Sequence, residues 1–224
     1  MKVLVIGGTG PSGIPLVRRL VDAAHEVTIL HRGTHERAET PPEGEHIHAD
    51  PFDEGSLRAA LDGRTWDVIA AMYGRLRRVA ELTVGRCGHF VSIGGVPAYR
   101  GWTDAGQFDP PGLPVPVGED ADLVADPAID DKAYRIVRTE RAVFAAHPRA
   151  AHFRYPYLYG PYQPAPREWS IVRRILDGRR RIVVADEGLT IHHHCYTENS
   201  AAAVARAIEQ PERSGGTIFN VADE

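Results

Sequence analysis

A glycine-rich loop near the N-terminus has the residue types and the spacing of a phosphate-binding turn. It follows the aliphatic run Lys2–Ile6 and precedes apolar residues at helical spacing. Glycine permits a tight turn and lets the backbone approach a pyrophosphate, which can bind the N–H groups at a helix start. A tight turn alone would also favour glycine, but the position in a first βαβ unit favours dinucleotide binding. The predicted contacts are Gly7, Thr9, Gly10, Pro11, Ser12 and Gly13.

The residues after the second expected strand indicate which dinucleotide would bind. The strand Glu26–Leu30 is followed by His31 and Arg32, without the carboxylate that binds ribose hydroxyls in NAD-specific sites. Arg32 offers a planar guanidinium suited to a 2′-phosphate. A solvated arginine is the alternative. The sequence therefore favours NADP as the cofactor, with NAD as the second choice.

Alternating strand-like and helix-like segments place this loop in an α/β fold. Strands are expected over residues 2–6, 26–30, 46–48, 66–70, 89–93 and 151–155, with helices between them. This order predicts a Rossmann-type doubly wound parallel sheet with a small C-terminal substrate lobe. We expect residues 1–160 to form an NAD(P)-binding Rossmann domain and residues 161–224 to form a short substrate-binding lobe built on that domain. Residues 99–130, which lack periodicity, are expected to form a loop or a mobile lid.

The composition excludes several classes of protein. The chain has 224 residues, of which 43% are hydrophobic, so it is not a disordered chain. Its 26 basic and 30 acidic residues give a net charge of −4, which argues against nucleic acid as the main partner. No apolar run approaches the roughly 18 residues of a membrane span. Cys87 and Cys195 form no CxxC pair, so a cytoplasmic protein is expected. The expected partner is a small-molecule substrate. A homodimer is compatible with the sequence.

Further motifs accompany the glycine loop along most of the chain. They are Asp50–Asp53 (D-x-x-D), Val68–Met72 on the fourth strand, the acidic pair within Gly118–Asp120, Arg154–Pro161 (close to R-P-x-x-x-Y-G-P) and Ser214–Val221 (G-x-x-F-N-V). With the glycine loop, they resemble the extended short-chain dehydrogenase/reductase superfamily, of the NAD-dependent epimerase/dehydratase type.

The resemblance implies additional cofactor contacts. In the family, the first Asp of the D-x-x-D motif contacts adenine, which assigns this role to Asp50 and the adjoining Pro51. The fourth strand passes the cofactor ribose, which implicates Ala70 and Met72. The R-P-x-x-x-Y-G-P motif runs beside the nicotinamide, which places Tyr157 at the reacting end.

The residues expected to perform the chemistry depart from the family pattern. The family uses a Ser or Thr, and a Tyr four residues before a Lys; the Tyr is the acid/base and the Lys lowers its pKa. Here Gly95 stands at the Ser/Thr position. Tyr134 has Arg138 four residues later, so we predict Tyr134 as the acid/base and Arg138 as its electrostatic partner.

A second alignment register is open. The family helix carries a Glu eight residues after the Tyr, and anchoring on Glu140 places Lys132 and Ile136 at the catalytic pair. Under that register both the Tyr and the Lys are lost. The predicted active site is therefore non-standard in either register.

Several histidines are candidate metal ligands. His192-His-His194 could combine with His46 and His48, but on a strand only His192 and His194 would share a face. The family's own strand carries histidines near this position, so no metal is expected.

Two functions from different classes fit these observations. The first is an NAD(P)-dependent oxidoreductase, epimerase or dehydratase (an oxidoreductase or isomerase) acting on a small polar metabolite such as a sugar derivative. The alternative is a catalytically degenerate sensor or regulatory protein that binds NADP(H). A third reading, RNA binding as in the chloroplast branch of the family, is opposed by the net charge of −4.

Overall fold

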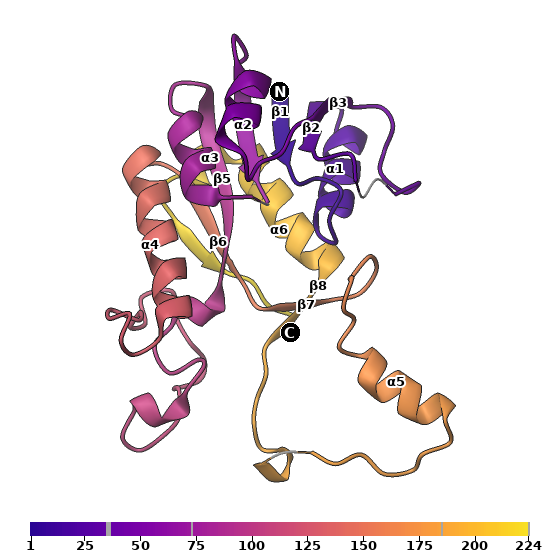
Figure 1. Cartoon of the computed structure of the whole chain (residues 1–224), viewed down its shortest axis with the longest axis vertical. Coiled ribbons are helices and arrows are strands. Elements are labelled where there is room, and N and C mark those ends of the chain that lie inside the picture. The colour runs from indigo at the N-terminus through magenta and orange to yellow at the C-terminus, as the bar shows by residue number, and fades with distance from the viewer. Residues whose placement is uncertain (35–36, 73, 185, 224) are drawn as a thin grey trace.

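A parallel sheet of seven strands forms the centre of the computed structural model, which describes residues 1–34, 37–72, 74–184 and 186–223 (Figure 1). The strand order is β3-β2-β1-β4-β5-β6-β9, and each neighbouring pair is parallel. The strands are β1 (Lys2–Ile6), β2 (Glu26–His31), β3 (Glu45–His48), β4 (Trp66–Ala71), β5 (Cys87–Gly95), β6 (Ala151–Tyr155) and β9 (Ile218–Asn220). The predicted Rossmann-type doubly wound sheet is confirmed, and its strand order reverses direction at β1.

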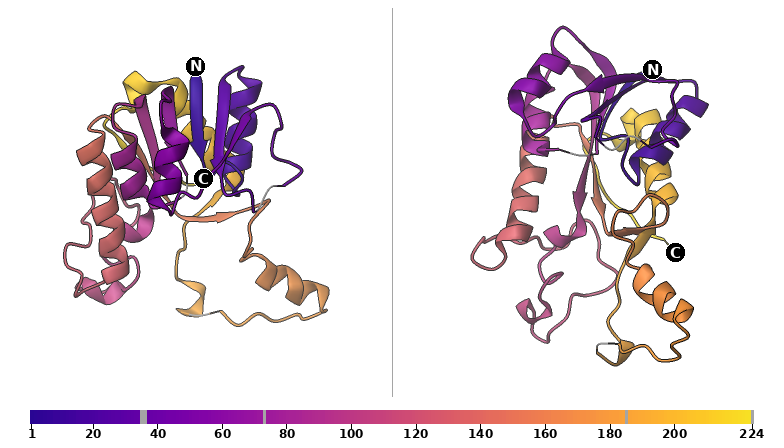
Figure 2. Two further views of the ribbon diagram at one scale, coloured as in Figure 1. Left: turned by 45° about the horizontal axis from the view of Figure 1, so that its top comes forward. Right: turned by 45° about the vertical axis from the view of Figure 1, so that its right-hand side comes forward.

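Helices cover both faces of this sheet (Figure 2). One face carries α1 (Gly13–Asp22) and α6 (Thr197–Glu209), and the other carries α2 (Glu54–Leu61), α3 (Leu76–Leu82) and α4 (Asp131–Ala146). The alternation of side chains along β1 explains the two layers, because Val3 and Val5 pack with the first group and Leu4 and Ile6 with the second. Within the described residues, no helix has both the length and the apolar composition needed to span a membrane.

The segment expected to form a C-terminal lobe contributes to two different parts of the molecule. The helix α6 and the strand β9 belong to the Rossmann layers, and the short α7 (Pro211–Ser214) lies between them in sequence. The strands β7 (Tyr157–Tyr159) and β8 (His194–Tyr196) form a separate two-stranded sheet. Between them α5 (Trp169–Leu176) projects from the body of the molecule, and none of its residues is buried (Figure 1). The domain boundary at residue 160 stays a prediction.

The base of the irregular segment 99–130 is tied to the last strand of the sheet. Tyr99 is only 1% exposed, and its hydroxyl donates to Asn220 Oδ1 at 2.8 Å. The backbone N–H of Asn220 donates to Glu119 Oε1 at 2.8 Å. This end of the segment is therefore fixed. That the segment 99–130 closes over a substrate stays a prediction.

A buried ion pair holds α4 against β6. Arg154 is 1% exposed and Glu140 is 5% exposed. The Arg154 guanidinium donates from Nη2 to Glu140 Oε1 at 2.7 Å and from Nε to Oε2 at 2.9 Å. Its Nη1 donates to the Tyr99 hydroxyl at 2.6 Å and to the Glu119 carbonyl at 2.9 Å. Bidentate pairing with additional hydrogen bonds is what makes two buried charges tolerable.

His152 lies beside this ion pair and is 1% exposed. Its Nδ1 is 2.7 Å from Ser92 Oγ, and its Nε2 is 3.5 Å from Glu140 Oε2. Burial lowers the pKa of His152 to about 4, against the opposing attraction of the Glu140 carboxylate. The imidazole is therefore neutral in the folded protein at neutral pH.

This burial predicts a loss of stability in acid. An unfolded histidine has a pKa near 6.5. Between about pH 6.5 and pH 4, the histidine at position 152 is therefore protonated in the unfolded chain but neutral in the folded protein. The free energy of unfolding falls by about 3 kcal/mol on this account as the pH is lowered through that range. Urea unfolding at pH 7 and pH 4 measures it. In His152→Asn, whose amide can still form a hydrogen bond with Ser92, we expect the free energy of unfolding to fall by about 3 kcal/mol less than in wild type between pH 7 and pH 4. An equal fall in both proteins would contradict the role given to His152.

Candidate functional site

The glycine loop and the end of β2 line one cavity of about 290 Å³. It lies at the carboxyl ends of β1 and β2, beside the point at which the strand order reverses, where ligands bind in open α/β sheets. The residues that line it are Gly7, Thr9, Gly10, Pro11, Ser12, Gly13, Leu30, His31, Arg32, Gly33, Thr34, Arg37, Pro51, Met72, Tyr162 and Pro164. The structure thus brings together the predicted loop residues with Arg32, Pro51 and Met72.

Close packing of the loop on itself explains its glycines. A Cβ added at Gly13 would lie 2.6 Å from the Gly7 carbonyl oxygen and 2.8 Å from Gly8 Cα. Gly7 has a φ of 90°, which side chains rarely allow. The backbone N–H of Ile14 donates to the Gly10 carbonyl at 3.0 Å, so the first turn of α1 rests on the loop. Gly10 differs, because a Cβ there would meet only the Gly7 carbonyl oxygen, at 3.6 Å.

These contacts predict different costs for two alanine substitutions in one loop. Gly13→Ala forces backbone atoms apart and should lower the free energy of unfolding by about 1–3 kcal/mol. Gly10→Ala is the matched control, and its effect should stay within about 0.5 kcal/mol. Urea denaturation of both variants checks this, and a Gly13→Ala protein as stable as Gly10→Ala would contradict the packing argument.

The cavity carries one more positive charge than the sequence analysis predicted. Arg32 and Arg37 both line it, and the Arg37 guanidinium is 5.7 Å from the centre of the Tyr162 ring. Sequence reasoning missed Arg37, although its place five residues after Arg32 was a usable signal. It also missed Tyr162 and Pro164, which come from a distant segment and reach the cavity only through the fold.

Three predicted cofactor contacts are not among the residues that line this cavity. Asp50 Oδ1 accepts from the backbone N–H of Phe52 at 2.9 Å, which stabilises the turn before α2. Ala70 is fully buried within β4. The Tyr157 ring lies under the Arg167 guanidinium at 3.8 Å, close to β8. The cofactor roles of these three residues stay predictions.

The predicted catalytic pair lies on α4 away from this cavity. Tyr134 is half-buried and Arg138 is exposed, and neither lines the cavity. The acidic residues at the helix start have other partners: Asp131 pairs with Arg135, and Asp130 Oδ1 accepts from the backbone N–H of Ala133 at 2.8 Å. The catalytic role of Tyr134 and Arg138 stays a prediction.

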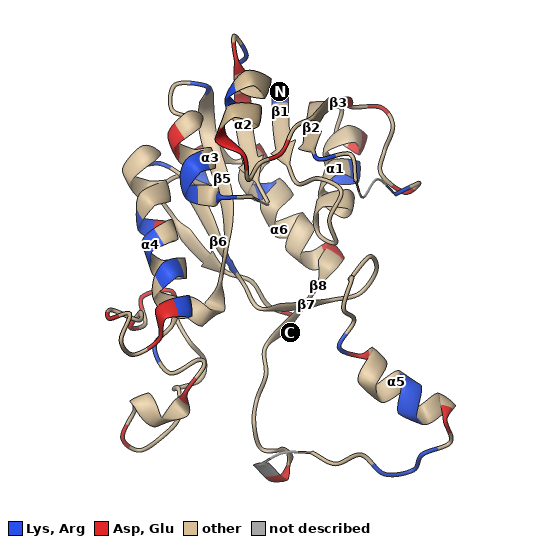
Figure 3. Ribbon diagram, viewed as in Figure 1, with Lys and Arg blue, Asp and Glu red and all other residues tan. Residues whose placement is uncertain are grey.

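Glu140, on which the second register is anchored, is buried. Glu140 binds Arg154, the first residue of the motif that resembles R-P-x-x-x-Y-G-P. Ile136, one turn earlier on α4, lines a groove of about 820 Å³ between α3 and α4, together with Gly95. In the second register, Ile136 stands at the position of the family's Lys, and Gly95 stands at the position of its Ser/Thr; both assignments stay predictions. Figure 3 shows the basic residues of α3 and α4 around this region.

Comparison with known proteins agrees with the motifs and the fold. No family model matches the chain. It is 27% identical to a 3-diazoavenalumate denitrifying reductase of Streptomyces over 93% of this chain and 72% of that protein. It is 25% identical to an Arabidopsis chloroplast stem-loop binding protein of 41 kDa, and it spans 59% of that protein's length. The crystal structure of a Bacillus cereus UDP-glucuronic acid 4-epimerase, in complex with UDP-glucuronic acid and NAD, matches with a TM-score of 0.76 and 17% identity, over 100% of this chain and 78% of that one.

The chain shares its fold with this epimerase. The predicted resemblance is thereby confirmed at the level of the fold. The cavity at the glycine loop lies beside the reversal of the strand order, which is where Rossmann folds bind dinucleotides.

Proposed function

We propose that the chain is an NADP(H)-dependent enzyme of the short-chain type that acts on a small polar metabolite such as a sugar derivative. The observation that carries the proposal is the cavity that joins the glycine loop to Arg32. The reductase and the epimerase among the similar proteins support enzymatic activity. The epimerase was crystallised with NAD, so the preference for NADP rests on this chain's own residues.

The charge at the end of β2 supports NADP over NAD. Strand β2 ends at His31, and the next residue, Arg32, lines the cavity where an NAD-specific site places a carboxylate. A guanidinium matches the geometry of a phosphate group by donating two parallel hydrogen bonds. Arg37 lines the same cavity and adds a second positive charge. Both arginines would attract the 2′-phosphate that distinguishes NADP from NAD.

The proposal predicts how Arg32 sets cofactor preference. Wild type should bind NADPH more tightly than NADH, and Arg32→Ala should weaken NADPH binding by about 10- to 100-fold, as expected for a lost charged contact worth about 1.5–3 kcal/mol. NADH affinity should stay unchanged. Fluorescence titration measures both affinities, with the exposed Arg179→Ala as the matched control. Equal affinities of wild type for NADPH and NADH would contradict the preference.

The reaction needs a proton donor or acceptor besides the nicotinamide, which supplies hydride transfer when it is bound. We propose Tyr134 for this role, with Arg138 one turn later stabilising the phenolate. An arginine holds its proton too tightly to relay it, so a water or a ribose hydroxyl would complete the relay. Gly95 supplies no hydroxyl, so another group must hold the substrate oxygen.

Two variants distinguish the registers once turnover with a substrate is found. Loss of a general acid/base should lower kcat about 100-fold or more in Tyr134→Phe, while NADPH affinity stays unchanged. Lys132→Met should then have kcat within a few-fold of wild type. If Tyr134→Phe keeps wild-type turnover, Tyr134 is not the acid/base and the register anchored on Glu140 holds.

The missing serine or threonine at Gly95 supports a second candidate, an NADP(H) sensor without catalysis. A panel of carbonyl compounds and nucleotide sugars separates the two, because the enzyme converts at least one member to product. A reductase would oxidise NADPH in doing so, whereas an epimerase or dehydratase would leave the total amount of each cofactor form unchanged, so substrate and product are measured directly. A sensor binds NADPH and converts no member. An RNA stem-loop belongs in the same panel, since one relative is a stem-loop binding protein. The net charge of −4 leads us to expect no RNA binding at physiological salt.

A further inference from the structure

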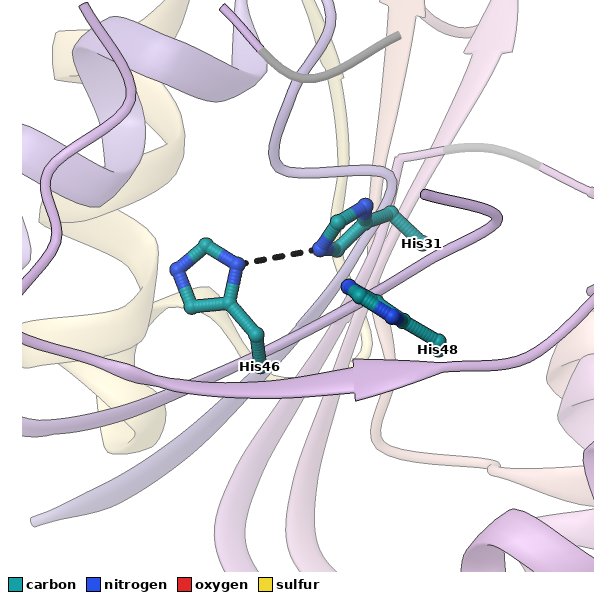
Figure 4. A group of neighbouring side chains, drawn as sticks. All are labelled: His31, His46 and His48. Carbon is teal, nitrogen blue, oxygen red and sulfur yellow. Dashed lines mark hydrogen bonds between the residues drawn. The ribbon is translucent and has the colours of Figure 1, made fainter. Parts of the chain in front are cut away.

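We propose that His31, His46 and His48 form a binding site for a transition-metal ion of the zinc class. The site lies at the carboxyl ends of β2 and β3, and Figure 4 shows the three imidazoles pointing toward one another. From the sequence alone, the run His192–His194 was the candidate partner of His46 and His48, not His31. The fold places His31 beside them, through a strand pairing that the sequence alone does not specify.

Strand register puts all three side chains on one face of the sheet. His31 and His48 are register partners in the parallel pair of β2 and β3, and His46 is the partner of Ile29. Residues two apart on a strand point to the same side, so His46 shares a face with His48, and Ile29 shares one with His31. Ile29 belongs to the core that packs under α1, which places the cluster on the α1 side of the sheet.

The imidazole nitrogens lie close to the separations that one ion requires. His31 Nε2 is 3.0 Å from His46 Nδ1, and the centres of the His31 and His48 rings are 4.8 Å apart. One ring nitrogen of each histidine lies within 4.8 Å of those of the other two. Nitrogens bound to one tetrahedral zinc at about 2.0–2.1 Å lie about 3.3 Å apart. Small side-chain rotations therefore bring all three onto one ion.

The hydrogen bonds of the metal-free cluster show what an ion would replace. The backbone N–H of Gly33 donates to His31 Nδ1 at 3.1 Å, so His31 carries its proton on Nε2 and donates it to His46 Nδ1. An ion between the two rings takes the place of this proton, which moves to His31 Nδ1. Gly33 is exposed, so water can accept from its N–H instead.

The ligand set selects the class of ion. Three imidazoles suit Zn²⁺, Cu²⁺, Ni²⁺ or Co²⁺, whereas Mg²⁺ and Ca²⁺ prefer oxygen ligands. His31 is 4% exposed, His46 is intermediate and His48 is exposed, so the site opens to solvent on one side. Three protein ligands with an open side leave a fourth position for water. His31 also lines the cofactor cavity, but His46 and His48 do not, so variants of these two residues test the metal site without changing a residue of that cavity.

Zinc binding to the full chain tests this proposal directly. Tag-free protein is stripped with a chelator and titrated with Zn²⁺ at pH 7.5 in competition with a chromogenic chelator, and Co²⁺ is added in parallel to record its visible absorption. Wild type should bind a single zinc and give the absorption bands of tetrahedral cobalt. Loss of a partner that merely orients a ligand costs about 10- to 100-fold in affinity, so removal of a ligand should cost at least about 10-fold.

The variants His46→Gln and His48→Gln should each show this loss. His193→Gln is the matched control, because His193 is an exposed histidine outside the cluster, and it should bind zinc as wild type does. Thermal unfolding of the stripped proteins shows whether each variant is folded. Zinc affinity that is equal in wild type and His46→Gln, or absent from wild type, overturns the site. A loss in His193→Gln as large as that in His46→Gln would also overturn it.

Discussion

The pairing of Arg154 with Glu140 is the interaction on which the arrangement of this molecule depends. Both groups are almost fully buried, and an isolated charge in such a place is so costly that each must keep its partner. Arg154 also binds the Tyr99 hydroxyl and the Glu119 carbonyl. One guanidinium therefore fixes α4, β6 and the base of the segment 99–130 relative to one another. Asn220 extends this network to β9, the last strand of the sheet.

The same ion pair fixes how α4 is rotated about its axis. Since Glu140 must face Arg154, Ile136 one turn earlier lies on nearly the same side of the helix and reaches the groove beside Gly95. Tyr134, two residues from Ile136, lies about 200° around the helix from it. Tyr134, the predicted acid/base, therefore lies on a different face of α4 from Ile136, which lines the groove beside Gly95. The predicted pair of Tyr134 and Arg138 and the register anchored on Glu140 therefore cannot both be correct.

Local sequence patterns predicted the parts of the structure that local physics determines. The strand-loop-helix unit that contains Gly13 follows from apolar periodicity and from glycine spacing, and Arg32 lies where its position after a strand implied. Tyr162 and the cluster around His31 were not predicted, because their side chains meet only through strand register and chain crossings. An apolar run alone does not make a strand: in the described part of the chain, Ile182–Val184 forms none, and Val183 is 98% exposed.

We propose that the cavity at the glycine loop binds NADP(H), and a crystal structure of the full chain grown with NADPH would decide this. We expect the pyrophosphate to lie against the loop Gly7–Gly13 and the 2′-phosphate to lie within hydrogen-bond distance of the Arg32 guanidinium. Nucleotide bound elsewhere, such as in the groove between α3 and α4, or an adenosine ribose turned away from Arg32, would contradict it.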